Sequence, residues 1–161
     1  MEQAVITAVT SDTSEAKLTV QRVPDRPGIA ASLFRGLAEH GVMVDMIVQN
    51  TSEEGHTDIS FTVPCEHMEL ARRSCLALAS EIGATEVAAD DAIAKVSLVG
   101  AGMKSHPGVS ATVFEVLAAR GINIEMISTS SIRITCVVRT DRMEEAVQAL
   151  HDAFELARPV T

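Results

Sequence analysis

The sequence contains no tryptophan and no tyrosine, and aromatic residues make up only 2% of its 161 positions. Aromatic side chains are the usual stacking platforms for nucleic-acid bases and for sugars, so their scarcity argues against a site for either. Basic residues are also few, because 13 lysines and arginines stand against 22 acidic residues and form no basic run. With a net charge of −9, we expect no nucleic-acid partner.

Long apolar runs are missing as well. No stretch reaches the ~18 consecutive apolar residues of a membrane span, and the N-terminal residues show no basic segment followed by an apolar one. We therefore expect a cytoplasmic protein with no membrane partner. Cysteines are few and widely spaced, and the five histidines are not at ligand spacing, so the sequence predicts reduced thiols, no metal and no cofactor.

Catalytic motifs are absent too. The chain has no GxxxxGK[ST] loop, and Gly100 and Gly102 form only half of a GxGxxG fingerprint. No nucleophile is paired with a base in the pattern that covalent catalysis needs. We therefore expect no catalytic residues. The alternative of a different class is a small acyl- or phosphoryl-transfer enzyme on a ferredoxin-like fold.

An internal repeat organises what is present. Pro27 and Gly28 recur 80 residues later as Pro107 and Gly108, and residues 44–47 recur as 124–127. Residues 57–61 match 131–135 at a shift of 74, which predicts that one connection is six residues shorter in the second copy. A hairpin loop is the place where such a length change costs least.

Hydrophobic periodicity predicts the order βαββαβ in each copy. In the first copy we expect strands at 16–23, 42–49, 57–63 and 85–89, with helices that begin near Ile29 and Met68. In the second copy we expect strands at 94–99, 123–129 and 132–139, with helices over 109–120 and 143–154. The second copy has no final strand of its own, because Pro159 removes a ladder donor, and an orphan strand near the N-terminus can supply it.

The expected architecture is therefore α+β, with two ferredoxin-like βαββαβ modules side by side. The first module spans 14–90 and the second spans 91–157, completed by an N-terminal strand at 3–10. Modules of this size bury too little surface to be stable alone, and each exposes a sheet edge. We therefore expect a homodimer.

The loop at 23–30 carries the most informative polar residues. It places the carboxylate of Asp25 beside the start of a helix, whose first N–H groups lack partners. Such a loop can hold both ends of an amino acid, with the helix binding the carboxylate and Asp25 binding the ammonium group. A purely structural interpretation remains open, in which Asp25 caps the helix and Pro27 begins it.

At these residues the sequence resembles the ACT domain, and in particular the tandem pair at the C-terminus of aspartokinases. Nearly the whole chain takes part in the resemblance, which is carried by the DRPGIAA loop at 25–31 and by the segments 13–17, 44–50, 57–62, 95–103 and 123–130. The kinase part of that family has no counterpart in this sequence. The chain is therefore similar to a separate regulatory β subunit, or to a fragment of an aspartokinase.

The resemblance implies an effector, threonine, possibly together with lysine, and feedback inhibition of a catalytic α subunit. It also implies that the effector lies between two chains of a dimer. The residues that match the family's binding positions are Asp25, Pro27, Gly28, Ile29, Ala30 and Gln49 from one chain, with Asn123 and Ile124 from its partner.

One motif departs from the family. Where the family commonly has Ser-Thr-Ser-Glu, this chain ends the same motif with Ser130 and Ser131. The two serines mark a possible second effector site, and the missing carboxylate predicts a weak or absent response to lysine. Two alternatives keep the fold and change the function: a module that senses a different amino acid, and an assembly module that binds none.

Overall fold

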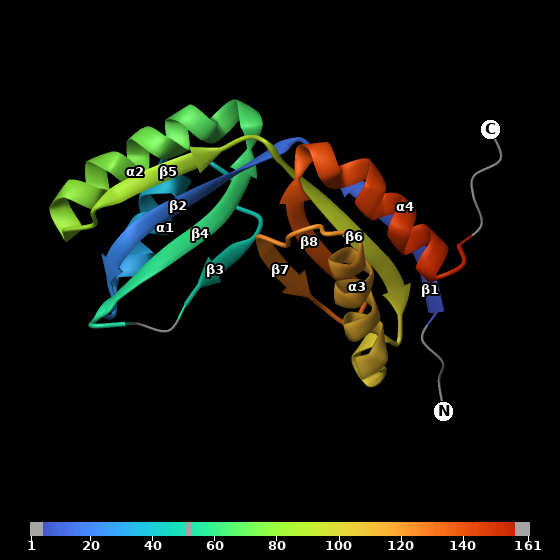
Figure 1. Cartoon of the computed structure of the whole chain (residues 1–161). Helices are drawn as coiled ribbons and strands as arrows, with labels where there is room; N and C mark the ends of the chain where they lie inside the picture. The colour runs from blue at the N-terminus through green and yellow to red at the C-terminus, as the bar shows by residue number, and fades with distance from the viewer. Residues whose placement is uncertain (1–4, 51–52, 157–161) are drawn as a thin grey trace. The chain divides into compact units, whose positions relative to one another are not determined.

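Figure 1 shows the chain as a computed structural model, which describes residues 5–50 and 53–156. Clustering of contacts divides the chain into two compact units. The first unit is Ser14–Asp91, and the second joins the N-terminal segment that ends at Thr13 to the segment that begins at Ala92. Residues 3, 4 and 157, which the expected segments 3–10 and 91–157 include, lie outside the described residues.

The first unit has the βαββαβ order that the periodicity predicts. Its elements are β2 (Glu15–Pro24), α1 (Ile29–Glu39), β3 (Ile47–Gln49), β4 (His56–Pro64), α2 (Met68–Ile82) and β5 (Glu86–Asp90), with a single 3-10 turn (Cys65–His67) before α2. The strands form an antiparallel sheet in the order β3-β4-β2-β5. This is the ferredoxin-like arrangement, and the α+β fold class is confirmed.

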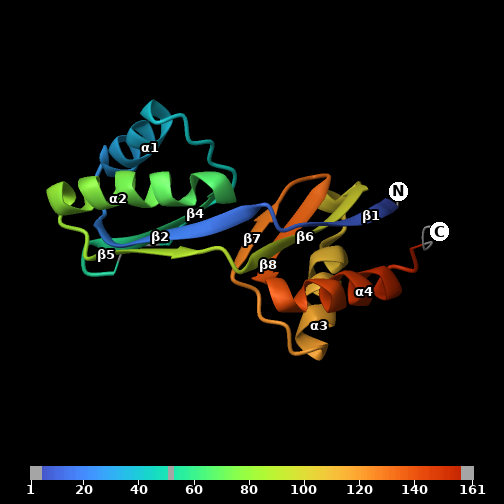
Figure 2. The same cartoon turned by 90° about the horizontal axis from the view of Figure 1, so that it is seen from above.

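The core of the first unit lies between this sheet and its helices, which Figure 2 shows on one face of the sheet. Leu18 and Val20 alternate along β2 toward that face and are fully buried. Helix α1 contributes Leu33 and Leu37, four residues apart on one stripe. Phe61 is 0% exposed. Its ring meets that of a helix residue, Phe34, edge to face at 5.5 Å.

The second unit repeats the arrangement, with its N-terminal strand in the place that the last strand, β5, has in the first unit. Its elements are β1 (Val5–Asp12), β6 (Ile93–Ala101), α3 (Pro107–Ala119), β7 (Met126–Thr129), β8 (Arg133–Arg139) and α4 (Met143–Ala153), with single 3-10 turns before each helix (Met103–Ser105 and Thr140–Arg142). The sheet order is β1-β6-β8-β7, so β1 is the edge strand beside β6. A second apolar cluster lies between this sheet and its two helices.

Two of the expected strands are too long. The expected strand at 42–49 is reduced to β3, and the one at 123–129 is reduced to β7. The chain before β3 still runs beside β4, since the N–H of Asp45 donates to the Thr62 carbonyl at 3.0 Å. Asp45 and Met46 both bond to Thr62, because the Thr62 N–H donates to the Met46 carbonyl at 3.0 Å and the Met46 N–H donates to the Thr62 hydroxyl at 3.1 Å. Regular one-to-one pairing therefore begins only at Ile47.

The alignment of 57–61 with 131–135 is wrong by one residue. Ile47 on β3 pairs with Phe61, and Ile127 on β7 pairs with Cys136, so the two copies match here at a shift of 75. Phe61 and Cys136 are both core residues, and a slip of one residue would turn either of them to the other face of its sheet. The connection between the two strands is therefore five residues shorter in the second unit.

Candidate functional site

A cavity of about 330 Å³ opens where β2 leads into α1 in the first unit. Six of the residues expected to bind an effector line it together: Asp25, Pro27, Gly28, Ile29, Ala30 and Gln49. The remaining lining residues are Val23, Pro24, Arg26 and Ile59. The fold thus gathers the end of β2, the loop after it, the start of α1, the end of β3 and one residue of β4 around a single cavity.

Helix α1 presents an open N-terminus to this cavity. The helix begins at Ile29 after Gly28, whose φ of 94° lies in the left-handed region that favours glycine, and no side chain caps the helix. The N–H of Ile29 reaches the Arg26 carbonyl at 3.4 Å. By helix geometry the N–H groups of Ala30 and Ala31 have no acceptor within the helix. These two groups and the helix dipole can hold an anion such as a carboxylate.

This geometry contradicts the structural interpretation of the loop. Asp25 forms no capping hydrogen bond, and Pro27 precedes the helix rather than beginning it. The N–H of Asp25 donates to the Gly55 carbonyl at 2.9 Å. Among the described residues, no group pairs with the exposed Asp25 carboxylate. The carboxylate is therefore available to a cation from outside the chain.

The floor of the cavity is apolar, which the sequence analysis did not anticipate. Val23 and Ile59 are 0% and 1% exposed and belong to the core of the first unit. For Ile59 the alternation of buried residues along β4 was an available signal. Val23 lies out of step with the alternation along β2, because the register shifts between Val20 and Val23. Gln49, which is exposed at the end of β3, adds an amide that can donate and accept.

The other two expected contact residues lie in the second unit. Asn123 and Ile124 follow α3, Asn123 being exposed and Ile124 packing partly on the core of that unit. Neither lines the cavity around Asp25. Within one unit, therefore, the fold assembles six of the eight expected residues.

The second unit has a cavity of its own, of about 460 Å³, lined by Met103, Pro107, Ser110, Thr129, Ser130, Ser131 and Ile134. Both residues of the possible second site, Ser130 and Ser131, contribute to it. Among the side chains that the structure describes, none in the lining is charged, and Ser105 stands where the repeat places Asp25 in the first unit. This cavity offers hydroxyl groups and apolar surface, so its chemistry differs from that of the first.

The described cysteines are free thiols. Burial raises the pKa of Cys75 and of Cys136 to about 11, so both stay protonated at neutral pH. In the part of the chain that the structure describes, no group of three or more histidine, cysteine or acidic side chains is placed to hold a metal ion. None of the described helices is both long and apolar enough to cross a membrane.

Family models, curated relatives and solved structures all relate this chain to ACT domains and aspartokinases. The family model described as "ACT domain" matches residues 7–77 and 96–154. The aspartokinase of Mycolicibacterium smegmatis is 52% identical over 158 residues, which is 97% of this chain. The same match covers 38% of that relative, so the chain spans less than half the length of the curated relatives it matches.

Two solved structures match over almost their whole chains. A crystal structure of aspartokinase alpha and beta subunits is 42% identical with a TM-score of 0.89, and the match covers 94% of this chain and 99% of that one. The ligand-free regulatory subunit of aspartate kinase from Thermus thermophilus is 39% identical with a TM-score of 0.89, covering 93% and 99%.

Proposed function

The chain belongs to the ACT-domain family, as a tandem pair of the kind found in the regulatory part of aspartokinases, and we propose that it is a non-catalytic regulatory subunit that binds threonine. Threonine binding would carry feedback inhibition to an aspartokinase catalytic subunit. Under this proposal the chain works in the cytoplasm, where it forms a homodimer and assembles with that catalytic subunit.

The observation that carries the proposal is the pairing of an unpartnered carboxylate with an open helix start in one cavity. An amino acid presents one anionic and one cationic group on a single carbon, and this arrangement meets both. The α-carboxylate would accept from the N–H groups at the start of α1, and the ammonium group would bind Asp25. Both ends of the ligand are then satisfied by one loop.

The rest of the lining favours a short side chain with one hydroxyl group. Val23 and Ile59 offer an apolar floor for a methyl group, and Gln49 offers an amide for a hydroxyl group. Threonine carries both groups on one carbon. A long cationic side chain such as that of lysine would find no acid in this lining other than Asp25, which the ammonium group already uses.

The homodimer would complete the site. Asn123 and Ile124 of one chain would contact the effector held by the first unit of the other, as the family resemblance implies. Exposed apolar residues on the edge strands support chain-to-chain pairing: Ile47 on β3 is 54% exposed and Ile127 on β7 is 43% exposed. An effector that binds one dimer arrangement more tightly shifts the population toward it, typically with about 1 to 3 kcal/mol of coupling.

Lysine would act weakly or not at all. The described residues around Ser130 and Ser131 that line the candidate second site include no carboxylate to bind the lysine side chain. By the repeat, Ser105 also occupies the position in the second unit that Asp25 occupies in the first, so the acid that would take the ammonium group is missing there. This part of the proposal predicts a threonine response that lysine neither reproduces nor strongly enhances.

Thermal unfolding of the chain with each amino acid in turn tests the proposal. A ligand at ~100 times its Kd adds roughly 2.7 kcal/mol to the stability of the folded state. We expect threonine to raise the Tm and lysine to leave it nearly unchanged. A shift with a different amino acid would replace the effector and keep the sensor, whereas no shift with any of them would favour an assembly module.

A further inference from the structure

The hairpin between β3 and β4 ends in a tight two-residue turn. The N–H of Glu53 donates to the His56 carbonyl at 3.0 Å, and the N–H of His56 donates back to the Glu53 carbonyl at 3.1 Å. Both residues between them have positive φ, 54° at Glu54 and 78° at Gly55. This is a type I′ turn, in which glycine removes the strain of the second left-handed position.

The tip of this hairpin is bonded to the loop that carries Asp25. The Gly55 carbonyl accepts the N–H of Asp25 at 2.9 Å, one step beyond the last residue pair of β2 and β4, which is Pro24 with His56. The ladder between the two strands therefore continues into the loop. Since Arg26 and Ile29 make only local hydrogen bonds, this bond is the long-range backbone contact that locates Asp25.

A second contact supports the same segment from the side of β2. Arg22 lies at an irregularity in the register between Val20 and Val23, with a positive φ of 54°. Its N–H donates to the Asp58 carboxylate at 2.9 Å. The end of β2 and the loop that follows it are thus each bonded to the β3–β4 hairpin, through Asp58 and Gly55 respectively.

The second unit lacks both halves of this arrangement. Its corresponding hairpin is five residues shorter and closes with the N–H of Ser130 donating to the Arg133 carbonyl at 2.8 Å. The equivalent ladder ends at the bond from the Gly100 N–H to the Ile132 carbonyl, before the loop that carries Ser105. The acidic residue and the long hairpin are therefore present together in one repeat and absent together from the other.

We infer that Gly55 is a positioning residue for the effector site, holding the backbone of Asp25 where its carboxylate meets the ammonium group of a bound amino acid. The inference rests on the proposed function and adds to it a residue outside the cavity lining that positions Asp25. None of the described residues of the hairpin tip, 53–56, lines the cavity, so we expect the tip to act through the N–H of Asp25. Distorting the turn should weaken effector binding without removing any ligand-contacting atom.

Two glycine substitutions separate this role from a general effect on stability. Gly55→Ala places a side chain at a φ of 78°, and Gly83→Ala does so at 80° after α2; at both positions the new methyl group meets open space. The two variants therefore carry a similar backbone penalty. Only the first disturbs the turn that bonds Asp25, so Gly83→Ala is the matched control.

Calorimetric titration of the whole chain with threonine measures the Kd of each variant and so tests the positioning role. The Tm of each ligand-free variant is measured beside it. We expect similar falls in Tm for both variants and a rise in Kd of roughly tenfold for Gly55→Ala alone. Glu54→Ile, which puts a β-branched residue at the first left-handed position, should raise the Kd as well and provides a second variant if the first folds poorly. Glu54→Asn, which suits a type I′ turn, should leave it unchanged.

The outcomes separate the two claims. If Gly55→Ala binds threonine as tightly as the unsubstituted chain does, the positioning role is overturned while the effector proposal stays intact. Absence of threonine binding by the unsubstituted chain would overturn both. A loss of affinity in Gly83→Ala as large as in Gly55→Ala would show that stability, and not the turn, controls binding, which also contradicts the inference.

Discussion

The hydroxyl oxygens of Ser97 and Thr135 lie 2.8 Å apart on the paired strands β6 and β8, and both residues are buried. The first unit contains the same link, because Thr19 on β2 and Ser60 on β4 are also direct partners with their hydroxyl oxygens 2.9 Å apart. Such cross-strand pairs stabilise a particular register. The same kind of cross-strand hydroxyl pair therefore occurs at the matching place in each of the two sheets.

Replacing Asp25 tests the proposed ammonium contact. Asp25→Asn keeps the size of the side chain and removes its charge, so a charge-assisted bond to the effector becomes a neutral one. We expect the Kd for threonine to rise on the order of tenfold to a hundredfold, with little change in Tm because the carboxylate has no partner among the described residues. Asp91→Asn, an equal charge change at an exposed residue outside the cavity lining, is the control. Unchanged binding in Asp25→Asn would show that the ligand lies elsewhere.

Ser131→Glu should create a response to lysine. The substitution adds a carboxylate to the lining of the second cavity, where the family motif commonly carries one. We expect lysine to raise the Tm of this variant and not that of the original chain. Ser128→Glu places the same charge at an exposed position of β7 outside that lining and should give no response. If both variants respond alike, net charge rather than the site is the cause.

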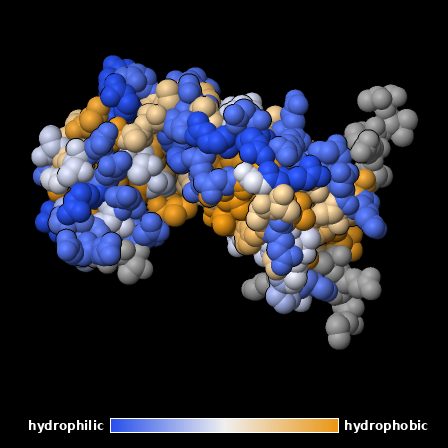
Figure 3. Space-filling model, in the orientation of Figure 1, coloured by the Kyte–Doolittle hydropathy of each residue, from blue (hydrophilic) through white to orange (hydrophobic). Residues whose placement is uncertain are grey.

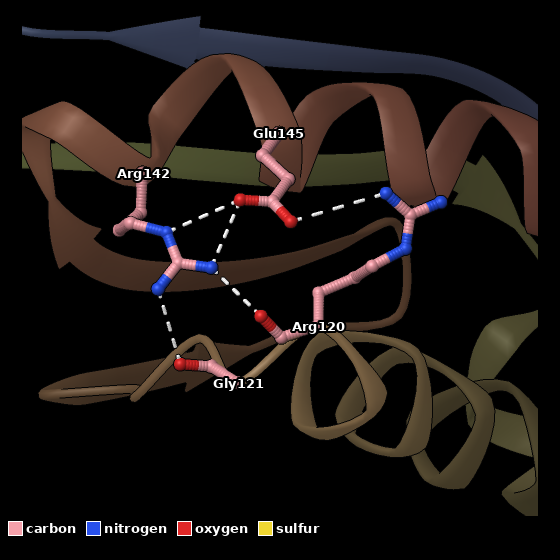
Figure 4. Close-up of polar contacts among 4 residues, drawn as sticks. All are labelled: Arg120, Gly121, Arg142 and Glu145. Atoms are coloured by element: carbon pink, nitrogen blue, oxygen red, sulfur yellow. Dashed lines mark hydrogen bonds and ion pairs between the residues drawn. The ribbon is translucent and has the colours of Figure 1, made fainter.

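Arg142 joins the start of α4 to the end of α3, as Figure 4 shows. Its guanidinium donates to the carbonyls of Arg120 at 2.7 Å and Gly121 at 3.2 Å, and it pairs with Glu145 at 2.9 Å. A cation at a helix C-terminus also interacts favourably with the helix dipole. We expect Arg142→Gln to lower the free energy of unfolding by about 1 to 2 kcal/mol, measured by urea titration.

The first unit offers the control for that substitution. Arg72 and Glu69 form an ion pair at the same spacing of three residues, but among the described contacts the Arg72 side chain bonds to Glu69 and to no backbone carbonyl. Exposed pairs of this kind contribute little to stability. Arg72→Gln should therefore leave the free energy of unfolding nearly unchanged. An equal fall in this free energy for Arg72→Gln and Arg142→Gln would contradict a role for the carbonyl contacts of Arg142.

Gly100 is required for the close approach of β1 to β6. A methyl group at this position would overlap the carbonyl oxygen of Val5 and lie 3.1 Å from the Cα of Ile6, at the register shift between Ile6 and Ala8. We expect Gly100→Ala to destabilise the second unit by roughly 1 to 3 kcal/mol in urea unfolding. Gly108→Ala meets open space inside α3 and should be neutral or stabilising. An unchanged free energy of unfolding for Gly100→Ala would show that β1 can move away from β6 to make room for the methyl group without loss of stability.

Buried thiols predict a fall in stability at alkaline pH. The pKa of Cys75 and of Cys136 is raised by burial from 9.0 to about 11, so the unfolded chain loses these protons first. The folded state therefore loses stability as pH rises from about 9 to 11, on the order of 1 kcal/mol per thiol at pH 10. Urea unfolding at pH 8 and pH 10 under reducing conditions measures this fall, and the double variant Cys75→Ala with Cys136→Ala should show a smaller one. An unchanged pH dependence in the double variant would rule out the thiols as its source.

Most of the element order was determined by the sequence. Alternation along β2 and the stripe of Ile29, Leu33 and Leu37 on α1 are local patterns, since a strand or a helix must turn its apolar residues to one side. The repeat at 80 residues predicted a duplicated fold for the same reason. The DRPGIAA loop pointed to a helix N-terminus next to an acid, and the fold brings six of the expected residues into one cavity.

The tertiary structure decided what depends on partners distant in sequence. The shift of 75 rather than 74 follows from which residue faces Phe61 across the sheet, and local patterns cannot distinguish it. The late start of regular pairing at β3 depends on how Asp45 and Met46 both bond to Thr62, and the placement of Asp25 depends on a carbonyl 30 residues away at Gly55. Periodicity in a sequence reports which side of an element is apolar, whereas hydrogen bonds between elements fix the register, and the register decides where the polar groups of a site meet.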